Sequence, residues 1–234
     1  ASFSFASGTI YVPYTLTLDA TGTLDDDHIV TYDWDFGDGT ILATSGAVIS
    51  HRYTQPDTIN ILLKVTYGFG ATNSMTLSLK LYSTIRWQDR YFASIQQAVN
   101  SASAGSVIFI NTAFYQSSNY SENLILTKSM TLENETPTAG KIKLNGAGNT
   151  AITISGNGIS ITLSHMEIFG GRGVYGGAIN VDGGYVYLHN VIISGSSADY
   201  GAGMYAQNCN LDMRTVTIAA NTATQQGGGL FLSA

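Results

Sequence analysis

The sequence predicts an all-β chain in two parts, a small antiparallel sandwich followed by a solenoid of short stacked strands. Up to about residue 82, short segments alternate between apolar and polar residues and are separated by glycine-rich turns. In the last third of the chain, apolar residues recur every 25 positions, a repeat length that is typical of solenoids. Between the two parts lies the only segment with good helical periodicity, residues 91–102.

Composition places the chain among globular proteins and argues against two kinds of partner. The 234 residues are 44% hydrophobic, enough for real cores, and only 11% charged. Ten basic residues are scattered over a chain of net charge −6, so we expect no nucleic-acid partner. No apolar segment approaches the roughly 18–20 residues that span a bilayer, so we expect no membrane span within this chain.

The single cysteine, Cys209, excludes an internal disulfide framework.

Four alternating segments define the strands expected in the N-terminal part. Regular short strands without helical periodicity indicate an antiparallel sandwich. The expected strands are residues 14–18, 29–34, 59–65 and 75–81. The turns between them are residues 21–23, 36–40, 55–57 and 67–70.

One of these turns resembles a family signature. The segment Trp34-Asp-Phe-Gly-Asp-Gly-Thr40 resembles the WDFGDGT motif of PKD domains, which are immunoglobulin-like extracellular modules. Residues 18–23 resemble the family's F-D-A-S-x-S segment, and residues 51–53 fall where the family has H-x-Y. The resemblance implies an immunoglobulin-like β-sandwich, which we assign to residues 1–83.

The residue types of this motif suit a buried strand that leads into a tight turn. Trp34 on a central strand would fill the space between two sheets. The two glycines permit positive φ in a tight turn, and the Asp38 carboxylate can accept local backbone hydrogen bonds, so we interpret Asp38 as structural. Asp57 and Ile59 stand where the family usually has Gly and Tyr. We therefore expect a turn that depends less on glycine and an unchanged fold.

Apolar residues in the C-terminal part form columns at one interval. Each turn should stack its apolar side chains on the turn below, about 4.8 Å along the axis, and roughly six turns would fit between residues 105 and 234. The columns are Ile161, Val186 and Leu211; Leu163, Leu188 and Met213; Ile168, Ile193 and Ile218; and Ile154, Ile179 and Met204. Leu230 continues the column of Met204, but at an interval of 26 residues and not 25.

The entry to this repeat resembles a second family. Residues 92–99, then Gly105 and the apolar strand 107–110, resemble the start of right-handed parallel β-helices of the pectate-lyase-like superfamily. The resemblance implies a right-handed parallel β-helix over residues 84–234, with one short N-terminal helix that caps its open end. Ser94 is the expected N-cap of that helix.

Glycine-rich segments link the repeat to surface proteins. The segments 176–179, 201–204 and 227–230 resemble the GGA[ILV] repeats of polymorphic outer-membrane adhesins. The pairing of modules resembles prokaryotic cell-surface proteins, which implies an extracellular or cell-surface location.

The repeat offers carboxylates but does not pair them. Parallel β-helix enzymes that cleave acidic polysaccharides need clustered carboxylates and a cation on one outer face. On the 25-residue grid, Glu167, Asp182, Asp199 and Asp212 each share a column with uncharged residues, and no lysine follows Lys143. We therefore assign no catalytic residue, and the sequence leans against an enzyme.

Calcium is the only cofactor that the sequence suggests. Asp25, Asp26, Asp27 and Asp33 offer hard oxygen ligands on adjoining segments, and some PKD-like modules bind calcium. The alternative is an acidic surface loop followed by a strand whose carboxylates face water.

Tyrosines and two asparagines are the other candidate contact residues. Exposed aromatic side chains beside the glycine-rich turns could stack on sugar rings or contact a partner protein, or they could instead shield loop backbones. These tyrosines are Tyr175, Tyr185, Tyr187, Tyr200 and Tyr205. Asn119 and Asn134 begin N-x-S/T triplets, which are acceptors for N-glycosylation in exported proteins.

The sequence stops at residues 229–234 in the middle of an expected turn. An uncovered solenoid end exposes unpaired backbone groups. We therefore expect that the native chain continues beyond residue 234 or that another molecule covers this end, with head-to-tail self-assembly as one form of cover.

These observations predict a secreted or cell-surface, non-catalytic structural or adhesion protein, such as an envelope or surface-layer component. Its partners would be extracellular proteins or glycans. Two alternatives stay open: a polysaccharide lyase or glycoside hydrolase of β-helix type, with its active site in turns after residue 234, and a glycan-binding module that uses the tyrosines.

Overall fold

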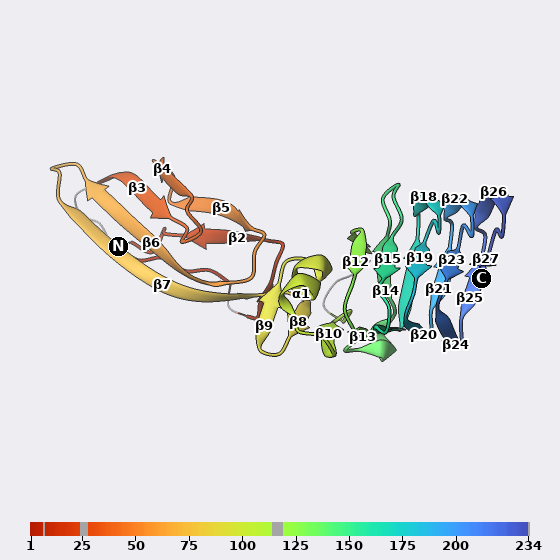
Figure 1. Cartoon of the computed structure of the whole chain (residues 1–234). Helices are drawn as coiled ribbons and strands as arrows, with labels where there is room; N and C mark the ends of the chain where they lie inside the picture. The colour runs from red at the N-terminus through yellow and green to blue at the C-terminus, as the bar shows by residue number, and fades with distance from the viewer. Residues whose placement is uncertain (7, 24–27, 114–118, 234) are drawn as a thin grey trace. The chain divides into compact units, whose positions relative to one another are not determined.

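The computed structural model describes residues 1–6, 8–23, 28–113 and 119–233. The chain divides into two compact units, Ala1–Ser83 and Thr84–Ala234, and each is described by itself. With 57% strand and 4% helix, the all-β class is confirmed (Figure 1).

Two sheets build the N-terminal unit. One has the strand order β1-β7-β6-β3-β4 and the other pairs β2 with β5. All pairs are antiparallel except β1 with β7, which is parallel. The strands are β1 (Ile10–Tyr11), β2 (Tyr14–Asp19), β3 (Ile29–Asp35), β4 (Ile41–Thr44), β5 (Val48–Tyr53), β6 (Thr58–Tyr67) and β7 (Thr72–Tyr82).

Aromatic side chains fill the space between these sheets. Trp34 is fully buried, as predicted, with the ring of Phe3 edge-on to it at 5.1 Å between centroids and the ring of Phe36 stacked at 6.5 Å. The alternation of β6 explains its placement, because Ile61 and Leu63 point into the core while the residues between them point outward. Burial of these large side chains holds the sandwich together without a disulfide.

The C-terminal unit is a coil of short parallel strands that follows a hairpin and one α-helix. The hairpin is β8 (Ile85–Trp87) and β9 (Arg90–Phe92), and the helix is α1 (Ile95–Ser101). A 3₁₀ helix, Pro137–Ala139, interrupts the second turn. The strands are β10 (Ser106–Ile110), β11 (Asn119–Ser121), β12 (Leu124–Leu126), β13 (Met130–Asn134), β14 (Ile142–Asn145), β15 (Ile152–Ser155), β16 (Ser160–Ser164), β17 (Met166–Phe169), β18 (Arg172–Tyr175), β19 (Ile179–Asp182), β20 (Tyr185–His189), β21 (Ile192–Ser194), β22 (Ser197–Tyr200), β23 (Met204–Gln207), β24 (Asn210–Arg214), β25 (Thr217–Ala219), β26 (Thr222–Gln226) and β27 (Leu230–Ser233).

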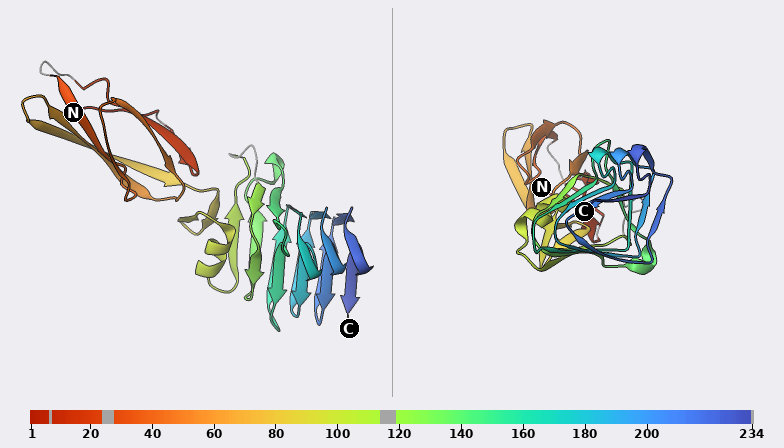
Figure 2. Two further views of the ribbon diagram at one scale, coloured as in Figure 1. Left: turned by 90° about the horizontal axis from the view of Figure 1, so that it is seen from above. Right: turned by 45° about the vertical axis from the view of Figure 1, so that its right-hand side comes forward.

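Four sheets run along the coil, so its later turns are four-sided (Figure 2). The sheets contain the orders β10-β13-β16-β20-β24, β11-β14-β17-β21-β25, β12-β15-β19-β23-β27 and β18-β22-β26. The neighbours within these orders pair in parallel, as a β-helix requires. The predicted parallel β-helix is confirmed.

Three of the four predicted apolar columns coincide with the observed register. The fourth is wrong at its first member, because Ile154 pairs with Val181 and it is Ile152 that pairs with Ile179. Leu163 pairs with Leu188 and Leu188 with Met213, while Leu230 pairs with Met204 one residue late. The number of turns is about five and not the expected six. Residues 105–234 accommodate only about five turns of 25 residues, and one of the turns is longer, since Met130 pairs with Ile161, 31 residues further along the chain.

Helix α1 is short and packs on the first turns, as predicted. Its residues Ile95, Ala98 and Val99 are buried in the same apolar cluster as the strands. The Ser94 side chain accepts a hydrogen bond from the Gln97 N–H at 3.1 Å, which confirms the N-cap. The carboxylate of Glu122 also accepts the N–H of Ile95 at 2.9 Å, so the helix start is tied to the next turn.

The corners of the coil use left-handed backbone conformations. His165, Asn190 and Thr215 occupy equivalent corner positions, and each has a φ of 55°. At another corner, Gly195 and Ala220 have φ values of 60° and 52°. An ordinary side chain can therefore occupy that corner in this fold, although the conformation costs some energy.

We expect removal of buried ladder side chains to destabilise the β-helix. Ile193 is fully buried in the core, and Ile193→Ala should lower the free energy of unfolding by about 2–5 kcal/mol because it leaves a cavity. Ile125 is 56% exposed, so Ile125→Ala should change it by less than about 0.5 kcal/mol. Urea denaturation followed by circular dichroism measures both. Equal effects of the two substitutions would contradict the assigned inward ladder.

Two glycine corners should respond differently to the same substitution. Gly195 and Gly201 have φ values of 60° and 59°, but a Cβ at Gly195 meets open space, whereas one at Gly201 would clash with the carbonyl group of Met204. Gly195→Ala should cost about 1–2 kcal/mol of stability through conformational strain alone. Gly201→Ala should cost about 1–3 kcal/mol more through overpacking. Thermal melts of both variants provide the comparison, and a milder effect at Gly201 would be inconsistent with this corner geometry.

Candidate functional site

A hollow of about 330 Å³ lies on the outer surface of the β-helix. We call it the tyrosine hollow, and it is lined by Tyr175, Asn180, Asp182, Tyr205 and Gln207. Its volume is at the lower end of the roughly 300–1,000 Å³ of small-molecule sites.

Strand alternation explains why these side chains point outward. On β19 the buried Ile179 and Val181 alternate with Asn180 and Asp182. On β23, which pairs with β19 in parallel, Asn180 lies beside Tyr205 and Asp182 beside Gln207. Tyr175 ends β18, directly before a corner of the coil. The inward core therefore fixes the positions of the outward polar groups.

Four aromatic rings pack together along one side of the hollow, and we call Tyr175, Tyr200, Tyr205 and Phe231 the aromatic cluster. The rings of Tyr175 and Tyr200 are stacked, with centroids 5.6 Å apart. Those of Tyr205 and Phe231 are stacked at 5.6 Å, and Tyr175 lies 4.9 Å from Tyr205 in a tilted arrangement. Tyr205 is only 8% exposed, whereas Tyr175 is 47% exposed. Tyr175 is therefore the more accessible of these two rings.

The other side of the hollow carries hydrogen-bonding groups. The Tyr205 hydroxyl donates to Gln207 Oε1 at 3.0 Å, and the Asn208 amide donates to Asp182 Oδ1 at 3.1 Å. Among the described residues, none is hydrogen-bonded to the Asn180 side chain. Asp182 is the one charged residue among the five that line the hollow. The hollow thus combines aromatic rings with amides and a single negative charge.

The structure brings together three of the five predicted tyrosines. Tyr175, Tyr200 and Tyr205 belong to the aromatic cluster. Tyr185 and Tyr187 lie on β20, in a different sheet, where Tyr187 pairs with Asp212. Sequence reasoning missed Asn180, Gln207 and Phe231.

The repeat itself contained the signal for these missed residues. Asn180, Tyr205 and Phe231 form one outward column, with Asp182 and Gln207 in the next. The sequence interval defines such columns for polar and aromatic residues as well as for apolar ones.

The carboxylates of the repeat occupy the expected columns. Glu167 lies between Lys143 and Ile192, and Asp182 lies between Ser155 and Gln207. Within the described strands of the β-helix, no carboxylate is paired in register with another. Glycoside hydrolysis commonly uses two carboxyl groups about 5–10 Å apart, and the register of these described strands places no two carboxylates directly side by side.

The predicted calcium ligands are only partly described. Asp25, Asp26 and Asp27 lie outside the described residues. Asp33 lies on β3, where it pairs with Ala43 and Lys64. Among the residues that the structure describes, no group of three or more His, Cys, Asp or Glu side chains could hold a metal ion. Calcium binding therefore stays a prediction.

The two N-x-S/T triplets differ in their surroundings. Asn119 is exposed at the start of β11. Asn134 is 2% exposed, and its amide donates to the Gly140 carbonyl at 2.6 Å and accepts from the Thr136 N–H at 2.9 Å. Because its side chain is buried, Asn134 suits a glycan less well in the folded chain than the exposed Asn119 does. The triplet alone cannot reveal this burial.

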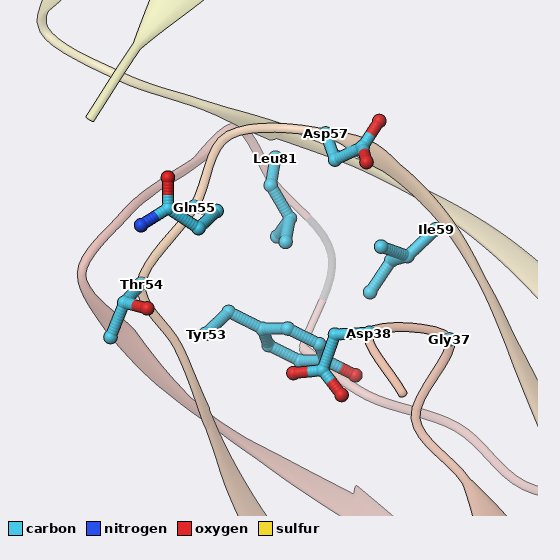
Figure 3. A pocket seen from close by; sticks show the side chains of 8 residues that line it. All are labelled: Gly37, Asp38, Tyr53, Thr54, Gln55, Asp57, Ile59 and Leu81. Carbon is cyan, nitrogen blue, oxygen red and sulfur yellow. The ribbon is translucent and has the colours of Figure 1, made fainter. Parts of the chain in front are cut away.

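A second hollow, also of about 330 Å³, lies in the N-terminal unit (Figure 3). Its lining residues are Gly37, Asp38, Tyr53, Thr54, Gln55, Asp57, Ile59 and Leu81. The Tyr53 hydroxyl donates to the Phe36 carbonyl at 2.9 Å. Asp57 accepts the Thr58 N–H at 2.7 Å. These polar groups are therefore engaged in holding local turns.

Asp38 is the best-connected carboxylate in this hollow. It accepts the Thr40 N–H at 3.1 Å and lies 2.7 Å from Nε2 of His51, whose ring stacks on Phe36. Burial acts to raise the pKa of Asp38, but the hydrogen bonds from His51 and Thr40 outweigh it and lower the pKa below its ordinary value. The pKa of Tyr53 is raised by burial and by the nearby charges of Asp38 and Asp35. Both residues act structurally, as expected for Asp38.

The lowered pKa of Asp38 predicts how the N-terminal unit responds to acid. A carboxylate whose pKa is lower in the folded state adds stability above its ordinary pKa of 3.8, and that stability is lost as the pH falls through the folded value. Between neutral pH and pH 4, Asp38→Asn should be less stable than the parent chain. Below pH 3.8 the gap should narrow, as thermal melts over this pH range would show. A constant gap would contradict the assigned role of the charge.

An immunoglobulin-like sandwich joined to a parallel β-helix defines a modular all-β protein. Its N-terminal module is a PKD domain, because residues 6–81 match that family. PKD domains occur in extracellular proteins. Over the described residues, helices long and apolar enough to span a membrane are absent.

One solved structure with a similar part is described as the structural basis for the promiscuous specificity of carbohydrate-binding modules from the β-sandwich superfamily. The two sequences are 31% identical and the TM-score is 0.34. The match covers 35% of this chain and 33% of that chain. This chain thus spans about a third of that protein's length. The PKD1 domain of Vibrio anguillarum Epp is 24% identical, with a TM-score of 0.30 over 35% of this chain and 90% of that one. The PKD1 domain of the Vibrio cholerae metalloprotease PrtV is 24% identical, with a TM-score of 0.29, and the match covers 34% of this chain and 91% of that one.

Proposed function

We propose that this chain is part of a prokaryotic extracellular or cell-surface protein with a non-catalytic adhesive or structural role. The observation that carries the proposal is the outer surface of the β-helix. Its columns gather tyrosines and amides around one hollow, whereas the described carboxylates stand apart from one another. Such a surface suits contact with a partner better than bond cleavage, which commonly needs positioned acid and base groups. The PKD domain supports the extracellular setting.

Of the two alternatives, glycan binding has the stronger support. Aromatic rings beside amides are chemically suited to sugars, and this arrangement is present in the tyrosine hollow. A polysaccharide lyase or glycoside hydrolase would need acid groups that the described columns do not bring together. Adhesion through a glycan and a structural role in an envelope are compatible, because both rely on lasting contact.

Two measurements test the proposed function. Intact producing cells treated with a membrane-impermeant biotin reagent should show labelled protein, because the chain lies outside the membrane. The purified chain, incubated with neutral and uronate-rich polysaccharides, should release neither reducing ends nor unsaturated products above a heat-treated control. Labelling only after cell lysis would overturn the location, and sustained product release would overturn the non-catalytic role.

A further inference from the structure

Resting on the proposed function, we propose that the tyrosine hollow binds a neutral sugar ring of an extracellular glycan. Tyr175 would provide the stacking surface, and Asn180, Asp182 and Gln207 would bind the hydroxyl groups. The inference deepens the proposed role because it names the class of partner and the side chains that bind it.

The position of β18 leaves Tyr175 without an aromatic column neighbour on the side away from β22. Strand β18 is the first strand of its sheet, and Tyr175 pairs with Tyr200 on the following strand β22. The ring of Tyr200 stacks on one face of Tyr175 with an angle of 19° between the planes. No strand of this sheet precedes β18 within the described turns, so no equivalent ring covers the opposite face. The 47% exposure of Tyr175 agrees with one covered and one accessible side.

The rest of the aromatic cluster holds this surface in place. Tyr205 is packed against Phe231 at 5.6 Å and against Tyr175 at 4.9 Å, and it is nearly buried. A ring fixed by its neighbours loses little conformational freedom when a ligand binds. The hollow therefore presents a preorganised aromatic surface.

Sugar chemistry matches the two sides of the hollow. One face of a pyranose ring carries C–H groups, which pack on an aromatic ring, while its hydroxyls both donate and accept hydrogen bonds. The amides of Asn180 and Gln207 can donate and accept, and the Asp182 carboxylate accepts. The Asn180 amide has no hydrogen-bond partner among the described residues, so binding a hydroxyl there breaks no such bond.

The charge of the hollow selects neutral sugars over uronates. Asp182 is negative, and neither Lys nor Arg lines the hollow. A uronate carboxylate placed there would be repelled by Asp182 with no cation to offset it. This property separates the proposed site from one that would serve acidic polysaccharides.

The test uses the full chain and four immobilised probes of equal length: gluco-, galacto- and manno-oligosaccharides and an oligogalacturonate. At least one neutral probe should bind, and the oligogalacturonate should bind more weakly than it. Tyr175→Ala should weaken binding of that probe about tenfold or more, given the typical strength of stacking on aromatic side chains. Asn180→Ala should also weaken it, while Asp182→Asn should narrow the preference for the neutral probe over the oligogalacturonate.

Tyr185→Ala is the matched control, because Tyr185 is also 47% exposed but lies on a different sheet. It should leave binding unchanged, and circular dichroism should show that both tyrosine variants are folded. Absence of binding to every neutral probe, a preference for the oligogalacturonate, or equal losses in the two tyrosine variants would overturn the inference. None of these results would alter the surface-labelling and product-release measurements, so failure here can be distinguished from failure of the proposed function.

Discussion

The inward stack of apolar side chains is the constraint on which the β-helix depends. Each turn must return to the same register so that Leu188 covers Leu163 and Ile193 covers Ile168. A slip of one residue would turn the whole set of apolar side chains toward water. Left-handed corner residues such as Asn190 and Gly195 allow the chain to change direction four times within a short turn. Packing and corner geometry together thus fix the course of the backbone.

The outer surface inherits its order from this core. Since side chains alternate along a strand, an inward column of Ile179 and Met204 requires an adjacent outward column of Asn180 and Tyr205. Residues 25 apart in sequence therefore become neighbours only a strand spacing apart, and Phe231 extends the same column. The side of the hollow formed by β19 and β23 thus results from regular stacking and needs no dedicated loop to bring its side chains together.

This dependence explains how much the sequence could predict. From Ile161 onward the interval is regular, so three of the columns, the separation of the carboxylates and the late Leu230 could be predicted. From β15 to β19 the step is longer, so a fixed interval wrongly places Ile154 beside Ile179 when its partner is Val181. Before that point the pairing of Met130 with Ile161 spans a longer turn of 31 residues, which a fixed interval cannot anticipate. The interval also does not reveal which columns lie on the same side of the coil. The sequence therefore predicts Tyr185 and Tyr175 as contact residues of one kind, although they lie in different sheets. Burial of Asn134 depends on contacts with Gly140 and Thr112 that no local pattern indicates.

The candidate site lies where the regular repeat changes. The sheet that contains Tyr175 begins at β18, and the preceding turn has the glycine-rich segment 146–150 between its strands instead of a fourth strand. Thr150 ties that segment to the Gly176 carbonyl at 2.9 Å, so the corner beside Tyr175 is held without an aromatic ring above it. In a uniform stack each tyrosine would be covered by the next on both faces. Because the ladder starts at Tyr175, its first ring has no aromatic column neighbour on the preceding turn, which is the side that the proposed sugar site would use, while the rings behind it pack against one another.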